Sequence, residues 1–215
     1  MKTLRLQSML RSCSLRATLL ALAASAAATL ASGSPGARPD PQDVARRVCV
    51  ACHGPGGHAV SPMFPHLATQ PAEYIAGELR AFRSHRRDDR AARDYMWGIA
   101  ATLDDETIDA LANYYAKQTP VTAPVETVKK ADAGRQIFQA GDPARGIPAC
   151  KSCHGEQGEG RGTFPRIAGQ QGSYLQHELQ ALRSGTRPAS VMQGVLTNMD
   201  DSQIESMAIF LSTQK

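Results

Sequence analysis

The sequence predicts an all-α protein built from two tandem domains, and three observations lead to that prediction. The chain of 215 residues repeats itself at a separation of about 100 residues. Apolar residues recur at helical spacing in both copies, and no segment shows the strict alternation that is typical of a half-buried strand. We therefore expect each copy to form a small helical unit of its own.

The repeat extends over three blocks of sequence. The motif CVACHG begins at Cys49 and CKSCHG begins at Cys150, and residues 64–84 align without a gap on residues 164–184, with ten identities in 21 positions. A third block pairs residues 96–115 with residues 192–211. The separation falls from 100 to 96 residues between the last two blocks, so the first copy holds four extra residues within 86–94, where we expect a surface loop.

Each copy contains two segments with the pattern of amphipathic helices. Pro71 is suited to the start of the first segment, and Asp104 and Asp200 stand where a helix N-terminus favours a carboxylate. The apolar faces that follow consist of Tyr74, Ile75, Leu79 and Phe82; Tyr174, Leu175, Leu179 and Leu182; Ile108, Leu111, Ala112 and Tyr115; and Ile204, Met207, Ala208 and Leu211.

The N-terminal residues have the order of regions found in a secretory signal. Lys2, Arg5, Arg11 and Arg16 precede a stretch of apolar or small residues at 17–30, which is too short to span a bilayer easily. We expect cleavage near Ala31 and export to the periplasm; an uncleaved anchor is the alternative. The expected division is a signal peptide at 1–31, a first domain at 32–117, a linker with two prolines at 118–128 and a second domain at 129–215.

Removing this signal changes the charge of the chain. The whole sequence has 24 basic and 20 acidic residues, and the signal takes four basic residues and no acidic ones, which leaves 20 of each. A formally neutral chain gives no reason to expect a nucleic-acid partner.

Two cysteine pairs carry the most specific chemistry in the sequence. Two thiols three positions apart can add to the two vinyl groups of one haem, and the histidine that follows then lies beneath the iron as an axial ligand. The pairs are Cys49 with Cys52 and Cys150 with Cys153, followed by His53 and His154. A thioredoxin-type redox pair, a zinc site and a disulfide framework are the alternatives, and none of them explains a histidine after each pair in two complete repeats.

The second axial ligand separates an electron carrier from a catalyst, because an open iron position permits catalysis. Both irons should be ligated alike, and Met96 and Met192 are methionines that the repeat pairs with each other. The other candidates lack such a partner: His58, Met63, His66 and His85 in the first copy, and His177, Met199 and Met207 in the second.

Pro65 and Pro165 follow the two axial histidines at 12 and 11 positions. A carbonyl in that turn can accept the proton on the far nitrogen of the imidazole, which fixes the ring and tunes the ligand. The alternative is a proline that starts a helix and has no electronic role.

Together these residues resemble the cytochrome c4 family, whose members carry two class I cytochrome c domains in tandem. The resemblance rests on the two CxxCHG motifs, FPHLATQ from Phe64, YIAGELRAFRS from Tyr74, and Met96 ahead of a helix with the sequence LDDETIDALANYY. It implies two covalent haem c groups, bound through the four cysteines with His53/Met96 and His154/Met192 as axial pairs, and two domains that each wrap around one haem. It also implies haems close enough for electron transfer between the domains.

The first hypothesis for function is an electron carrier, and not an enzyme, between a quinol-oxidising complex and a terminal oxidase or reductase. It would work free in the periplasm or peripherally associated with the membrane. The alternatives are a dihaem subunit of a dehydrogenase, such as a flavocytochrome that oxidises sulfide; a dihaem peroxidase or thiosulfate dehydrogenase; and a structural zinc module.

Three further features distinguish the two copies. Residues 80–93 contain six arginines, which form either a docking patch for an acidic partner or a solvated helix end and loop. Trp97, which Gln193 replaces in the second copy, either lines the first haem crevice or fills core space. The first copy also lacks the pair Gly134 and Phe138, which in the second can pack on the terminal helix near Phe210.

Overall fold

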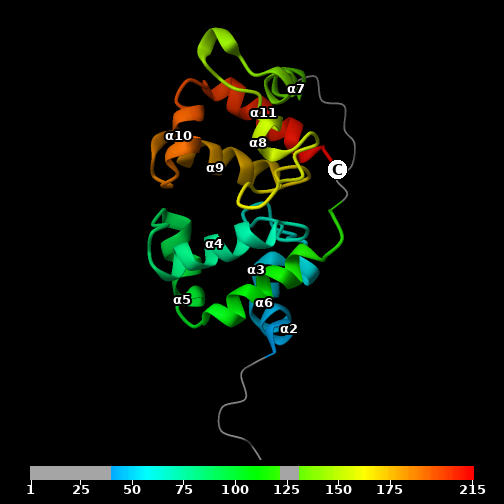
Figure 1. Cartoon of the computed structure of the whole chain (residues 1–215), viewed down its shortest axis with the longest axis vertical. Coiled ribbons are helices and arrows are strands. Elements are labelled where there is room, and N and C mark those ends of the chain that lie inside the picture. Colours follow the sequence, from blue (N-terminus) through cyan, green and yellow to red (C-terminus); the bar gives the residue numbers. More distant parts are fainter. Residues whose placement is uncertain (1–39, 122–130) are drawn as a thin grey trace, which may run out of the picture. The chain divides into compact units, whose positions relative to one another are not determined.

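The computed structural model describes residues 40–121 and 131–215, and the fold in this part of the chain is helical, as predicted. Figure 1 shows the helices coloured along the sequence, from blue at α2 to red at α11. The signal peptide expected at 1–31 and most of the expected linker lie outside the described residues. Among the helices of the described ranges, none is both long and apolar enough to cross a membrane.

The first domain begins with three short helical segments around its cysteine pair. They are α2 (Pro41–Val44), the π-helical turn η1 (Ala45–Cys49) and α3 (Val50–His53), followed by the 3₁₀ turn η2 (Pro55–Gly57). The longer helices are α4 (Ala72–Arg83) and α6 (Asp105–Ala116), and between them lie the π-helical turn η3 (Ala92–Met96) and α5 (Trp97–Ala100).

The second domain repeats this order with fewer interruptions. Helix α7 (Ala131–Ala140) opens it, and the 3₁₀ turn η4 (Pro143–Arg145) leads to α8 (Lys151–His154), which carries the second histidine. Helices α9 (Gly172–Ser184), α10 (Ser190–Leu196) and α11 (Asp201–Ser212) correspond to α4, η3–α5 and α6. Within the described residues, strand pairing is limited to the isolated bridges Asp142–Ile147 and Arg161–Phe164.

The helix starts confirm the capping prediction. The Asp104 side chain accepts a hydrogen bond from the Thr107 backbone N–H at 2.8 Å, and Asp200 accepts one from the Gln203 N–H at 2.9 Å. The Gln203 side chain also accepts from the Asp200 N–H at 3.1 Å, which completes a capping box. These bonds fix where the last helix of each domain begins.

Each domain buries the apolar face of its last helix against the helices before it. Ile108 and Leu111 are almost fully buried in the first domain, as are Ile204 and Leu211 in the second. Met199 and Met207 belong to the core of the second domain, so the prediction that they fill space there is confirmed by their packing.

The first and last helices of the second domain pack closely through residues that the first domain lacks. Gly134 on α7 lies so close to α11 that an added Cβ would stand 2.2 Å from the Ser206 carbonyl oxygen. One turn later the rings of Phe138 and Phe210 lie 5.4 Å apart. In the first domain, the opening segment contributes the buried Ala45 to the core instead.

The region that holds the four extra residues is a surface loop only in part, because it contains two buried charged residues and continues into helical turns. Arg87 and Asp89, which lie in the insertion region, are 8% and 6% exposed, and the Asp89 carboxylate accepts a hydrogen bond from the Ala92 N–H at 3.0 Å. The Asp89 carboxylate therefore helps to start the helical turn η3, and Arg87 turns inward, where it pairs with Glu178 of the second domain.

We predict that Gly134→Ala lowers the free energy of unfolding of the haem-loaded protein by roughly 2–4 kcal/mol, because the new methyl group overlaps the α11 backbone. Gly77→Ala is the matched control, since Gly77 lies on α4 with nothing within 4 Å of an added Cβ. Alanine at that exposed helical position should raise stability by ~0.5–1 kcal/mol. Urea unfolding measures both changes, and a Gly134 variant as stable as the wild type would contradict the close contact.

Candidate haem sites and the domain interface

The first cysteine pair lies on consecutive helical turns. Cys49 ends η1, Cys52 and His53 lie on α3, and His53 is 8% exposed. Gly54 ends the helix with φ of 70°, and a Cβ there would stand 2.1 Å from the His58 carbonyl oxygen. Only glycine fits this turn, which explains the last residue of the motif.

The second pair has the same arrangement. Cys150 precedes α8, which carries Cys153 and His154, and His154 is 7% exposed. Gly155 has φ of 91° and lies against the Glu159 side chain. The two motifs therefore present paired thiols and a buried imidazole in one shared geometry.

Both imidazoles are held by the proline carbonyl that the sequence predicts. The Nδ1–H of His53 donates to the Pro65 carbonyl at 2.9 Å, and that of His154 donates to the Pro165 carbonyl at 2.9 Å. Burial lowers the pKa of both histidines, although the proline carbonyls oppose this, so the neutral form is favoured. A neutral ring whose Nδ1 carries the proton leaves Nε2 to bind a metal.

The cysteines do not fit the alternative sites. Burial raises the pKa of the Cys49 thiol, and it raises that of Cys150 to about 11, whereas a reactive redox pair needs a lowered thiol pKa. All four described cysteines are free of disulfides. Residues 40–121 and 131–215 also contain no group of three or more His, Cys, Asp or Glu residues that could hold a metal ion, so the two pairs do not converge on zinc.

The residues present fit a covalently attached haem c. The donor set at each site is two thiols three positions apart and one imidazole oriented through Nδ1, and the first thiol of each pair is partly buried beside the apolar core. Vinyl groups of haem react with such thiols, and the fixed Nε2 supplies an axial ligand.

The two paired methionines lie at corresponding places in the domains. Met96 ends η3 and packs against the buried residues Phe82, Ala92 and Ala100, while Met192 lies on α10 and packs against the core of the second domain. The Phe64 ring contacts His53 edge-on at 6.1 Å and also Tyr95 at 5.4 Å, which precedes Met96. This chain of rings connects the histidine and methionine segments of the first domain.

The rival ligands lie elsewhere. Met63 is 65% exposed, and His177 is exposed on α9. His58 bonds through Nε2 to the Thr119 carbonyl at 2.8 Å, and the His85 ring stacks on Trp97. His66 is half-buried beside the second domain, so it faces the domain interface.

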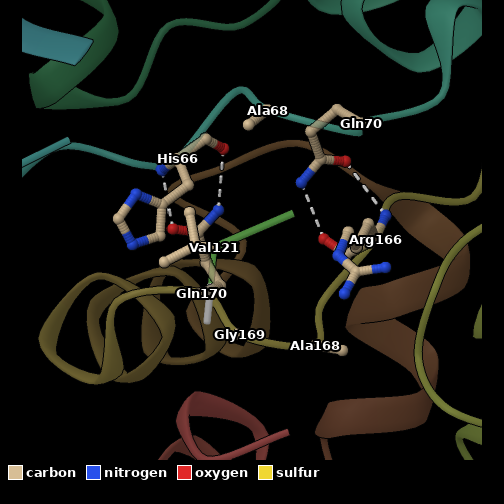
Figure 2. Close-up of a pocket in the computed structure, with 8 residues that line it drawn as sticks. All are labelled: His66, Ala68, Gln70, Val121, Arg166, Ala168, Gly169 and Gln170. Carbon is tan, nitrogen blue, oxygen red and sulfur yellow. Dashed lines mark hydrogen bonds between the residues drawn. The ribbon is translucent and has the colours of Figure 1, made fainter. Parts of the chain in front are cut away.

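A reciprocal pair of glutamine amides connects the two domains (Figure 2). Gln70 donates through Nε2 to the Arg166 carbonyl at 2.7 Å and accepts from the Arg166 N–H at 3.0 Å. Gln170 donates to the His66 carbonyl at 3.0 Å and accepts from the His66 N–H at 2.8 Å. Because Gln70 and Gln170 are equivalent in the repeat, as are His66 and Arg166, each domain makes the same contact to the other.

A buried charge cluster forms the second cross-domain contact. Glu78 of α4 and Glu178 of α9 each pair with both Arg87 and Arg187. The Arg87–Glu178 and Arg187–Glu78 pairs cross between the domains at 3.1 Å each, and Arg187 also donates to the Tyr74 hydroxyl at 3.1 Å. These charges form one network, which we call the interface charge cluster: Glu78, Arg87, Asp89, Glu178 and Arg187.

Arg187 and Asp89 keep their charges despite burial. Burial opposes the charge of Arg187, but its acidic neighbours, including Glu78 and Glu178, hold its pKa well above the ordinary value. Burial also opposes ionisation of Asp89, yet Arg87 lowers the pKa of that carboxyl, with which it pairs at 2.9 Å. The cluster thus brings three carboxyl groups together with two guanidinium groups.

The sequence contains a signal for this interface in the polar residues that the two repeats share. Gln70/Gln170 and Glu78/Glu178 are identities in the gapless block, and the same separation of 100 residues also pairs Arg87 with Arg187, three positions beyond the end of that block. Identical polar residues that the core of each domain does not need indicate a surface with the same role in both repeats, which here is the domain interface.

The six arginines of residues 80–93 do not form one exposed positive patch. Arg80 and Arg83 pair with Asp105, and Arg80 also pairs with Asp109 at 2.8 Å. Arg87 is buried in the interface charge cluster, and Arg90 pairs with Asp94 at 3.3 Å. These contacts favour the alternative of a helix end and loop, because much of the charge of the segment is paired within the molecule.

The comparisons with known proteins agree with this geometry. The family model described as Cytochrome c matches twice, over residues 42–118 and 131–215. Cytochrome c-552 of Acidithiobacillus ferridurans is 38% identical over 170 residues, which cover 77% of this chain and 73% of that protein. The cytochrome c4 structure from Acidithiobacillus ferrooxidans superposes with a TM-score of 0.72 at 37% identity, over 77% of this chain and 98% of that one.

The chain belongs to the cytochrome c4 family. Other relatives at comparable identity have the same name, such as cytochrome c4 of Thiocapsa roseopersicina, at 34%. The protein therefore binds two covalent haem c groups through CxxCH motifs and acts as an electron carrier with redox proteins as partners, not as an enzyme.

One further relative is named after the enzyme from which it accepts electrons. The thiosulfate dehydrogenase electron acceptor of Thiomonas intermedia is 36% identical over 173 residues, which cover 77% of this cytochrome c4 and 78% of that protein.

We predict that His66 makes this cytochrome c4 less stable in mild acid. Burial, and to a smaller extent the charge of His58, lower the pKa of His66 from 6.5 to about 4, so between these values the unfolded chain binds more protons than the folded one. The free energy of unfolding should therefore fall as the pH drops from about 6.5 towards 4. His66→Gln should remove roughly 1 kcal/mol of the difference between pH 7 and pH 5, after allowance for solvent screening.

Urea unfolding of the haem-loaded protein at the two pH values measures this contribution. His177→Gln is the control, since His177 is exposed and should leave the pH dependence as it is in the wild type. Equal pH dependence in the wild type and the His66 variant would contradict the prediction.

Proposed function

We propose that this protein carries electrons in the periplasm between a quinol-oxidising complex and a terminal oxidase or reductase. The observation that carries the proposal is the equivalence of the two sites: each has the same histidine–carbonyl hydrogen bond and a methionine at the corresponding place. An iron held by imidazole and thioether keeps its ligands in both oxidation states, which suits electron transfer and leaves no position for a substrate.

The proposed ligands follow from the same equivalence. Cys49 and Cys52 hold the first haem and Cys150 and Cys153 the second. The axial pairs are His53 with Met96 and His154 with Met192. The soft thioether sulfur stabilises the reduced iron, so each haem would have a raised reduction potential.

The domain division supports transfer within the molecule. We propose domains at 32–117 and 129–215 joined by a linker at 118–128, after a signal peptide that is cleaved near Ala31. The amide contacts and the interface charge cluster hold the two haem-bearing units against each other, so electrons can pass through one protein in two steps.

A second candidate function is that of an electron acceptor for a thiosulfate dehydrogenase. It is favoured by the relative of that name in Thiomonas intermedia and by the structure of thiosulfate dehydrogenase TsdBA from Marichromatium purpuratum, of which this chain covers 40%. Stopped-flow reduction by a purified thiosulfate dehydrogenase, compared with reduction by a quinol-oxidising complex, separates the two candidates, because the physiological donor should reduce the protein much faster.

We predict that Met96→Ala and Met192→Ala each remove the methionine-to-iron charge-transfer band of one haem and let that haem bind carbon monoxide. Loss of the sulfur ligand should also lower the potential of the affected haem. An anaerobic redox titration with absorption spectra, on protein produced with a haem-attachment system, measures all three effects.

Met63→Ala and Met207→Ala are the controls, because one side chain is exposed and the other belongs to the core. Both should keep two low-spin haems with the band. A wild-type haem that lacks the band and binds carbon monoxide would contradict the ligand assignment and favour a catalytic site.

A further inference from the structure

Arg87 and Arg187 pair with equivalent glutamates of the opposite domain. Their neighbours within their own domains differ. Arg187 is followed two residues later by Ala189, and the residues at the positions of Phe82 and Trp97 are Leu182 and Gln193. Arg87 instead has Asp89, Phe82 and Trp97 as neighbours within its own domain. Among the residues that the structure describes, these three contacts occur at Arg87 and have no equivalent at Arg187.

Three contacts join Arg87 to the segment that carries Met96. The Trp97 indole Nε1–H donates to the Arg87 carbonyl at 2.9 Å. The Arg87 guanidinium lies 4.7 Å from the centroid of the Phe82 ring, and Met96 and Trp97 both pack against the small core group formed by Phe82, Ala92 and Ala100. The residue next to the proposed iron ligand is thus bonded to the backbone of an arginine whose side chain pairs with Glu178 of the second domain.

His85 supports the position of Trp97 from the other side. Its imidazole stacks on the indole with ring centroids 3.8 Å apart and an angle of 14° between the planes. His85 has φ of 57°, the left-handed conformation that Gly185 adopts at the equivalent helix end. A side chain costs free energy in this conformation, and the stacking contact offsets that cost.

We propose that Trp97 and Arg87 are positioning residues that hold the Met96 segment against the domain interface, so that contacts made by the second domain set how firmly Met96 is held at the first haem. This rests on the proposed ligation by Met96. The second haem has no such connection, because Gln193 and Leu182 make no corresponding contact to Arg187 among those found in the described residues.

Competition with added imidazole tests the proposal. Imidazole replaces the methionine ligand of an oxidised haem, and its apparent affinity rises with the fraction of molecules in which that methionine has moved away. The measurements use the haem-loaded full-length protein with Met192→His, in which only the first haem keeps a methionine, and with Met96→His, in which only the second does.

Trp97→Phe keeps an aromatic ring but removes the hydrogen-bond donor. We expect it to raise the imidazole affinity of the first haem about three- to tenfold, the effect of one lost hydrogen bond, and to change that of the second haem less than twofold. Gln193→Ala, at the equivalent position beside Met192, is the matched control and should change either haem less than twofold. Unchanged affinity at the first haem in the tryptophan variant would overturn the proposal.

Glu178→Gln tests the connection from the second domain. Helix α9, which carries Glu178, packs against α10 with Met192, so a merely structural effect would appear at the second haem. The proposal expects the larger rise in imidazole affinity at the first haem, and a larger rise at the second would overturn it. If this variant does not fold, as thermal unfolding would show, the tryptophan variant decides alone.

The absorption spectrum of the parent protein distinguishes failure of the proposed Met96 ligation from failure of the positioning role. If the parent protein with Met192→His shows no methionine-to-iron band at all, Met96 is not the ligand, and the proposed function fails together with this inference. If the band is present and the Trp97 variant leaves the imidazole affinity unchanged, only the positioning role is lost.

Discussion

The arrangement of the two haem sites depends on the sharing of two carboxylates between the domains. Glu78 and Glu178 each pair with arginines from both repeats, and removal of either would leave buried guanidinium groups with too few partners. Charges that are buried in this way tolerate little change in distance, since a displacement exposes them to an unfavourable environment. The cluster therefore fixes the relative orientation of the helices that carry it, α4 and α9, and through their connections the loops that hold His53 and His154.

Much of the fold and of each haem site could be predicted because the relevant signals are local. The CxxCH motif spans little more than one helical turn, the helix caps involve residues three positions apart, and the repeat aligns residues that have the same role in both domains. The bond from His53 to the Pro65 carbonyl was also predictable, since the short loop between these residues limits where the proline can lie.

The interface could not be predicted with the same ease, because its partners lie about 100 residues apart and their pairing depends on how two finished domains meet. Residues 80–93 illustrate this: a run of arginines looks exposed in the sequence, yet the partners that bury Arg87 come partly from the other domain. The insertion was expected to form a loop for the same reason, since nothing near Asp89 in the sequence indicates that its carboxylate turns inward. Trp97 likewise has its hydrogen-bond partner ten residues earlier, across a turn whose shape the sequence does not specify.

The amide contacts in Figure 2 follow a rule of symmetry, in which Gln70 meets the residue equivalent to the one that Gln170 meets. Such contacts are isologous and are the kind that two identical subunits make about a two-fold axis. In a homodimer every substitution appears on both sides, so both cofactors always change together. In a duplicated chain a single codon change alters one side only, as Asp89, Trp97 and His85 do here. Covalent fusion of the two halves thus preserves the geometry of a dimer while it frees each iron to acquire surroundings of its own.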